Sequence, residues 1–221
     1  PSTGASEIVL QEEASQAHSG EGYWINLSDN YRILDNGDLI WWSERDGFGH
    51  LYRYLGDEGW RGYQRLTKGN FVVTKLVGVN EQDGHLFYLA TSEDDPLEQH
   101  VYSLDLDAEG PATAQRLTEP GFMHTAKMDA KGQTLLITRS SDNSPPQTYI
   151  ADEQGNRLAW VEENALDSDH PYAPYLSSHR PVEYGTIEAD DGTPLYWEMV
   201  TPELEPGKRY PVYFYHYGGP G

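Results

Sequence analysis

The sequence repeats itself at an interval of about 50 residues, and this repeat limits the folds that the chain can adopt. The segment Gln64-Arg65-Leu66-Thr67 returns as Gln115-Arg116-Leu117-Thr118. Turn dipeptides that end in glycine recur at a similar interval, at Asn36-Gly37, Asp83-Gly84 and Lys131-Gly132. A fixed period of this length is typical of architectures that stack one small structural unit on the next.

Each of the three units has the pattern of four short strands. An apolar stretch that ends in serine follows each turn, and a polar loop then leads to a strand with an aligned tyrosine, namely Tyr52, Tyr102 or Tyr149. The fourth strand carries the Gln-Arg-Leu-Thr copies in the first two units and residues 158–161 in the third. Four short strands in each repeat of this length indicate the blades of a β-propeller.

Three blades are too few to close a propeller, which typically has 4–8. The units therefore either form an open arc or follow blades that precede Pro1, and the sequence favours the second alternative. Residues 7–11 are a plausible strand of a preceding blade, and residues 23–27 lead into the next unit. The start without Met and the abrupt end at Gly221 fit a fragment of a longer protein.

The repeat fades after Asn164, and a different organisation follows. Residues 167–180 are polar and rich in Pro and Ser, as in a linker. Two apolar stretches, 182–187 and 194–200, flank an Asp-Asp-Gly turn and predict a hairpin. The run 210–217 is apolar on both alternating faces, which predicts a strand buried on both sides of a largely parallel sheet.

Composition excludes several classes of function. With 15 Lys and Arg against 36 Asp and Glu, the net charge is -21, so no basic surface is available for nucleic acid. No apolar run is long enough to span a bilayer. The chain has no Cys, and its eight His residues lack the spacing of a metal motif, so we expect neither a metal nor a cofactor.

Two motifs resemble those of one family. Residues 41–52, Trp-Trp-Ser-Glu-Arg-Asp-Gly-Phe-Gly-His-Leu-Tyr, resemble the late-propeller signature of the dipeptidyl peptidase IV branch of the prolyl oligopeptidase family. Residues 210–221, which end in Tyr217-Gly-Gly-Pro-Gly, resemble the strand and turn that open the α/β-hydrolase domain of that family. The resemblance implies an all-β partial propeller over residues 1–179, followed by the opening strands of a truncated peptidase domain over 180–221.

The resemblance also implies an activity and one site residue. Such enzymes are serine exopeptidases that release N-terminal dipeptides, typically Xaa-Pro or Xaa-Ala, and Tyr217 would stabilise the oxyanion of the tetrahedral intermediate. The nucleophile of an α/β-hydrolase lies in a Gly-x-Ser-x-Gly turn, which these 221 residues lack, so we expect the chain alone to be inactive. The expected partners are peptide substrates and a second copy in a homodimer; the family points to the periplasm or a secreted protein.

Other readings of the sequence stay open. An acylaminoacyl- or oligopeptidase-type enzyme shares the architecture, and a non-catalytic propeller that binds proteins is a further alternative. The pair Glu12-Glu13 lies in the wrong context for the glutamates with which this branch binds a substrate amino group, so we interpret it as solvated charge. We interpret residues 44–47 as a hairpin turn, and His50 and His100, at equivalent blade positions, as packing residues.

Overall fold

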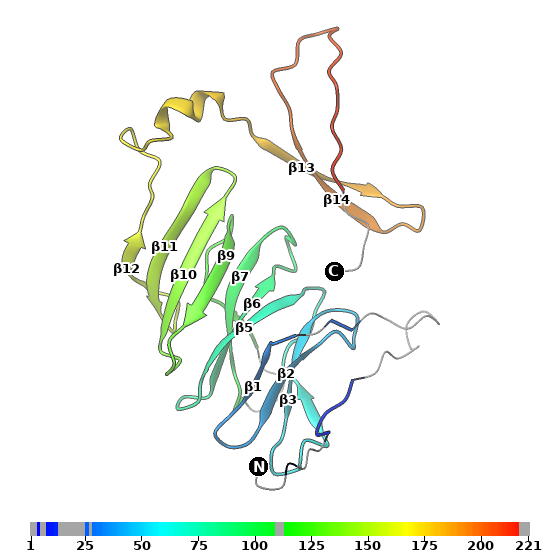
Figure 1. Ribbon diagram of the computed structural model, residues 1–221, viewed down its shortest axis with the longest axis vertical. Helices are drawn as coiled ribbons and strands as arrows, with labels where there is room; N and C mark the ends of the chain where they lie inside the picture. Colours follow the sequence, from blue (N-terminus) through cyan, green and yellow to red (C-terminus); the bar gives the residue numbers. More distant parts are fainter. Residues whose placement is uncertain (1–3, 5–7, 13–24, 27, 109–112, 217–221) are drawn as a thin grey trace.

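The computed structural model describes residues 4, 8–12, 25–26, 28–108 and 113–216, and its regular elements are almost all β-strands. Figure 1 shows three blades side by side; the linker leaves the third blade, and the hairpin that follows lies above the blades in this view. The described residues include no helix of the length and apolarity that a membrane crossing requires. The predicted all-β partial propeller is confirmed, and within the described chain its sheets do not close into a ring.

Each blade is a meander of four antiparallel strands, as the repeat predicts. The first blade contains β1 (Tyr31–Ile33), β2 (Leu39–Ser43), β3 (His50–Tyr54) and β4 (Tyr63–Arg65). The second contains β5 (Val73–Asn80), β6 (His85–Thr91), β7 (Gln99–Asp105) and β8 (Gln115–Arg116). The third contains β9 (Met123–Met128), β10 (Thr134–Ser141), β11 (Ser144–Asp152) and β12 (Arg157–Glu162).

The second and third blades share one eight-stranded sheet instead of forming separate units. The two blades join where β7 pairs in parallel with β9, at Gln99 opposite Met123. After the third blade come a 3₁₀ helix, η1 (Ala173–Ser178), inside the predicted linker, and the predicted hairpin of β13 (Val182–Glu188) and β14 (Pro194–Val200). The hairpin prediction is therefore confirmed.

The turn glycines of the repeat meet a backbone requirement. Gly37, Gly84 and Gly132 all have positive φ angles, of 88°, 71° and 75°, which side chains with a Cβ rarely adopt. At Gly132 a Cβ would also lie 2.6 Å from the Cα of Asn80 in the neighbouring blade. This glycine therefore serves both the turn and the close approach of two blades.

The core lies between the blades, and β6 belongs to two parts of it. Leu86, Tyr88 and Ala90 belong to the buried cluster shared with the first blade. Phe87 and Leu89, which point to the opposite face, belong to the cluster shared with the third blade. Strand β6 is therefore buried on both faces, and each face needs a neighbouring blade.

The repeated Gln-Arg-Leu-Thr segment places a threonine against a buried histidine in two blades. Thr67 Oγ1 lies 3.0 Å from His50 Nδ1 and accepts a hydrogen bond from the backbone N–H of Leu51, also at 3.0 Å. Thr118 makes the same two contacts with His100 and Val101. Both histidines are fully buried, so their predicted role as packing residues is confirmed.

A third buried histidine lies at the seam between the second and third blades. The Nδ1 of His124 donates to the carbonyl of Gln99 at 2.9 Å, which leaves a lone pair on Nε2. This Nε2 has no hydrogen-bond partner among the described residues, and it lies 3.7 Å from a carboxylate oxygen of Glu119. Burial lowers the pKa of His124 to about 4.

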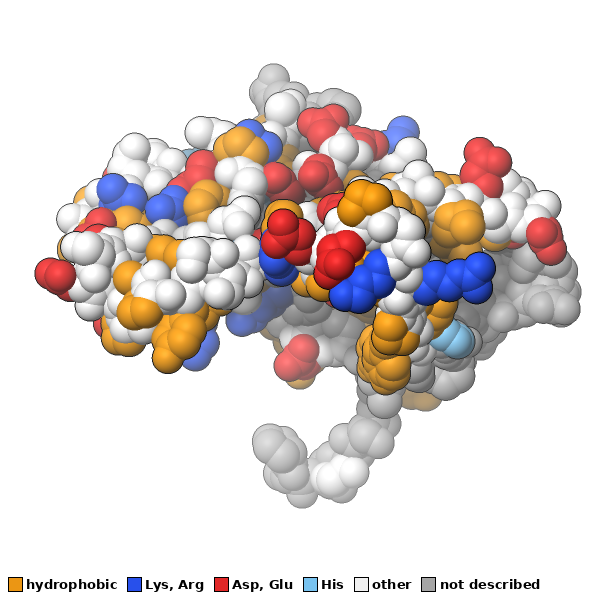
Figure 2. Space-filling model, turned by 90° about the horizontal axis from the view of Figure 1, so that it is seen from above, with side chains coloured by type: hydrophobic (Ala, Val, Ile, Leu, Met, Phe, Trp, Pro, Cys, Tyr) orange, Lys and Arg blue, Asp and Glu red, His pale blue; other side chains and the backbone are white. Residues whose placement is uncertain are grey.

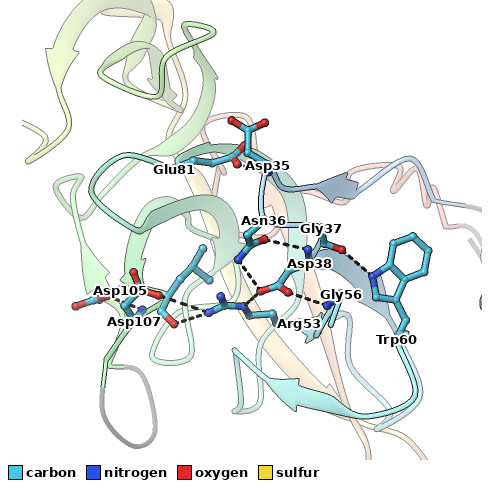
Figure 3. A network of polar contacts seen from close by, with 11 residues as sticks. Asp35, Asn36, Gly37, Asp38, Arg53, Gly56, Trp60, Glu81, Asp105 and Asp107 are labelled. Atoms are coloured by element: carbon cyan, nitrogen blue, oxygen red, sulfur yellow. Dashed lines mark hydrogen bonds and ion pairs between the residues drawn. The ribbon is translucent and has the colours of Figure 1, made fainter. Parts of the chain in front are cut away.

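A polar network around Asp38 and Arg53 links the first two blades at the end that carries the turn between β1 and β2 (Figure 3). Arg53 donates to Asp38 at 2.7 Å and to the carbonyl of Leu106 in the second blade, also at 2.7 Å. Burial opposes the charge of Asp38, but hydrogen bonds from the Gly56 N–H and Arg53 lower its pKa below the usual value. The network satisfies a buried carboxylate and ties one blade to the next.

Two predicted strands are absent. Residues 8–12 form no strand; Leu10 instead packs beside the buried cluster around Tyr52. Residues 210–216 form no strand either, and Val212, Tyr213 and Phe214 are 70–88% exposed. A strand of this kind needs a partner on each side. In the described chain no strand pairs with either segment. In Figure 2, seen from the hairpin side, hydrophobic side chains lie open at the surface.

We expect the variant Thr67→Val to lower the free energy of unfolding by about 2 kcal/mol, because it leaves the Leu51 N–H and the His50 ring nitrogen buried without partners. Urea denaturation followed by tryptophan fluorescence measures this change. The control is Thr125→Val, which changes an exposed threonine of β9. Equal midpoints for the two variants would show that the threonine–histidine pair contributes nothing.

We expect stability to fall between pH 6.5 and pH 4 in part because of His124. Its pKa in the folded chain is about 4, against roughly 6.5 in an unfolded one, so the unfolded chain takes up the proton first as the pH falls. The contribution of neutral His124 to the free energy of unfolding is therefore complete above pH 6.5 and is lost as the pH falls to about 4. Urea midpoints at several pH values should therefore decline less steeply for His124→Gln than for the wild type. The exposed His216→Gln should follow the wild type, and identical slopes for all three proteins would refute this role.

Candidate functional site

One end of the propeller faces the C-terminal segment. This is the end that carries the turn between the second and third strands of each blade, at residues 44–49, 92–98 and 142–143. The linker contacts this end directly, since His179 donates to the carbonyl of Asp142 at 3.1 Å. Any function that needs both the propeller and the segment after it must use this end.

In the first blade this end holds Arg45 between tyrosine rings. The guanidinium lies 4.5 Å from the centroid of the Tyr52 ring and 4.8 Å from that of Tyr63, which is the geometry of cation–π contacts. The same guanidinium forms an ion pair with Glu12, and both side chains are more than four-fifths buried. The prediction that Glu12 is solvated charge is therefore wrong, because the N-terminal segment folds onto this turn and pairs Glu12 with Arg45.

The neighbours of Arg45 keep its guanidinium charged and engaged in an ion pair and in contacts with tyrosine rings. Burial alone would lower its pKa, but its interactions with Tyr54 and Glu12 raise the pKa above the usual value. Tyr52 donates to Asp46 at 2.6 Å, and burial together with this hydrogen bond raises the pKa of Tyr52. Residues 44–47 form the predicted turn, closed by a hydrogen bond from the Gly47 N–H to the Glu44 carbonyl. Arg45 thus holds two segments together.

In the third blade the same end borders a cavity of about 750 Å³ between the β10–β11 turn and the linker. Such a volume is typical of small-molecule sites, and most of the lining is apolar. The polar groups come from both walls. The lining includes Ser140, Asp142 and Pro145 from the blade, and His170, Tyr172 and His179 from the linker.

Asp142 connects the two walls of this cavity. Its carboxylate accepts a hydrogen bond from the Tyr184 hydroxyl at 2.7 Å, and its backbone carbonyl accepts one from His179 Nε2 at 3.1 Å. The hydrogen bond to Asp142 raises the pKa of Tyr184 to about 12. The sequence contains no signal for this cluster, because its members lie about 40 residues apart and belong to no motif.

The predicted site residue lies outside the described residues. The structure describes the chain up to His216, so it gives no position for Tyr217, and Glu13 also falls in an undescribed part. In the described ranges no group of three or more His, Asp or Glu side chains is arranged to hold a metal ion. The described residues provide a set of packed blades, an N-terminal segment held by the Glu12–Arg45 ion pair, and hydrogen bonds from the linker and the hairpin to Asp142.

Comparison with known proteins places this architecture in a family. Residues 2–146 match the family model of the dipeptidyl peptidase IV N-terminal region. Dipeptidyl peptidase 8 of Mus musculus is 25% identical over 96% of the chain, which corresponds to 27% of that protein. A probable dipeptidyl-aminopeptidase B of Penicillium rubens is 31% identical over 71% of the chain, or 17% of that protein.

The fold comparison agrees with the sequence comparison. The crystal structure of Porphyromonas gingivalis dipeptidyl peptidase 4 matches 82% of the chain with a TM-score of 0.68 and 26% sequence identity, and the match covers 25% of that structure. The chain thus spans about a quarter of the length of such relatives. The chain belongs to the dipeptidyl peptidase IV branch of the prolyl oligopeptidase family, and its blades form part of the N-terminal region of that family.

Proposed function

We propose that the chain is part of a serine peptidase that releases N-terminal dipeptides of the type Xaa-Pro or Xaa-Ala. In this proposal residues 1–179 supply the last blades of the propeller, and residues 180–221 open the α/β-hydrolase domain. The observation that carries the proposal is the extent of the similarity. The family model ends at residue 146, whereas the similarity to the mouse peptidase covers 96% of the chain and so continues into the hairpin and the apolar run.

The exposed apolar run supports the division into two domains. Tyr213, Phe214 and Tyr215 are 83–88% exposed, which is unusual for three consecutive aromatic side chains. A contiguous apolar surface of this kind usually marks an interface. In the proposal, strands of the peptidase domain that lie beyond these 221 residues cover the run.

The proposed chemistry divides between the chain and the rest of the enzyme. A serine attacks the carbonyl after the second residue of the substrate, a histidine takes the serine proton and then gives it to the leaving amine, and an aspartate orients the histidine. The Tyr217 hydroxyl donates to the oxyanion. Because no Gly-x-Ser-x-Gly occurs in the chain, the 221 residues alone should not hydrolyse peptides.

We expect Tyr217→Phe in the longer peptidase to reduce kcat about 100- to 1,000-fold towards Ala-Pro-p-nitroanilide, the usual effect of losing one oxyanion donor. KM should change little, because the hydroxyl acts on charge that develops in the transition state. The measurement is the release of p-nitroaniline. Tyr213→Phe, which removes a hydroxyl from the same run, serves as the matched control.

Three results would count against the proposal. Equal kcat for both variants would remove Tyr217 from the catalytic site. Hydrolysis of acylated or longer peptides in place of Ala-Pro-p-nitroanilide would assign the enzyme to another branch of the family. Absence of hydrolysis of any peptide by the folded, full-length protein would favour a binding role for the propeller.

A further inference from the structure

The last blade is connected to the C-terminal segment chiefly by hydrogen bonds that converge on one residue. Asp142, in the turn between β10 and β11, accepts from Tyr184 on β13 through its carboxylate and from His179 through its backbone carbonyl. One side-chain acceptor and one main-chain acceptor of a single residue thus bind both the hairpin and the end of the linker.

Few apolar side chains are buried between the last blade and the C-terminal segment. The 3₁₀ helix η1 has no buried residue, and Tyr184 on the hairpin is 45% exposed. In the described part of the chain, β13 and β14 pair only with each other. The cavity of about 750 Å³ occupies the space between blade and linker that side chains fill elsewhere in the fold. The polar contacts must therefore determine how the hairpin lies on the blade.

Further hydrogen bonds within the linker orient His179, one of the two partners of Asp142. The Tyr172 hydroxyl lies 3.0 Å from Nδ1 of His179, whose Nε2 must donate because its partner is a carbonyl. His170 lies 3.0 Å from the Asn164 amide oxygen through Nε2, and its Nδ1 accepts the Tyr172 backbone N–H at 3.0 Å. Each histidine therefore has a defined tautomer, and the linker reaches Asp142 in one orientation.

We propose that Asp142, Tyr184 and His179 form a latch that sets the angle between the last blade and the hairpin, and that Asp142 thereby acts as a positioning residue for the peptidase. The latch follows from contacts within the chain. Its effect on the reaction rests on the proposed function, in which a substrate spans the two domains, with its amino end at the propeller and its scissile carbonyl at the peptidase site.

The first experiment tests the latch in the 221-residue chain. Hydrogen–deuterium exchange, read by mass spectrometry on peptides within residues 170–200, compares Tyr184→Phe and Asp142→Ala with the wild type. Each variant removes one partner of the same hydrogen bond, so exchange should be roughly 3- to 10-fold faster in both. The double variant should be no faster than either single variant, because both changes remove one interaction.

The control is Tyr196→Phe on the paired strand. Its hydroxyl makes no hydrogen bond to another described residue, so exchange should match the wild type. Equal exchange in Tyr184→Phe, Asp142→Ala and this control would overturn the latch. Exchange that is faster across all three blades would also overturn it, because it would show a general loss of stability.

The second experiment tests positioning in the longer peptidase with Ala-Pro-p-nitroanilide. Loss of the latch should raise KM about 3- to 10-fold and leave kcat within about twofold, because substrate must first bring the two domains to the right angle. Asp142→Asn, which keeps an acceptor for Tyr184, should restore most of the KM. An unchanged KM in Asp142→Ala together with faster exchange would leave the latch established and refute its effect on the reaction. An inactive wild type would refute the proposed function alone, since exchange in the chain is read without catalysis.

Discussion

The burial of β6 on both faces is the constraint on which the rest of the structure depends. A single four-stranded blade exposes two apolar faces, and alternate side chains of β6 fill the seams with the first and third blades. The buried polar residues follow from this stacking. His50 and His124 contact the buried carbonyls of Gly69 and Gln99. The threonines of the repeat accept hydrogen bonds from the backbone N–H groups of Leu51 and Val101, which would otherwise be buried without a partner.

The two ends of the blades make different contacts. At one end Gly132 approaches the neighbouring blade closely, and Asp38 and Arg53 tie the first blade to the second. At the other end the turns contact segments that are distant in sequence. Arg45 holds the N-terminal segment through Glu12, and Asp142 holds the linker and the hairpin. The second end is therefore the one at which blades and peptidase segment meet in the proposed enzyme.

The features that the sequence predicted are those that repeat or that depend on neighbours in the chain. The blade period, the glycine turns, the His50 and His100 positions and the β13–β14 hairpin all fall in this group. The ion pair of Glu12 with Arg45 and the contact of Tyr184 with Asp142 link residues about 30–40 positions apart without a motif, so the sequence could not reveal them. The run 210–217 shows a further limit, because its pattern predicts a buried strand while burial depends on partners that pattern alone does not supply.

The most direct test of the stacked-blade account is native-state hydrogen exchange of the β6 amides, residues 86–90, over a range of urea concentrations. If both faces of β6 hold the blades together, these amides open only when the whole chain unfolds, with the free energy and urea dependence of global unfolding, whereas amides of the outer strand β12 open at lower free energy. Exchange of the β6 amides through a local opening well below the global free energy would contradict the account, because the middle blade could then loosen without its neighbours.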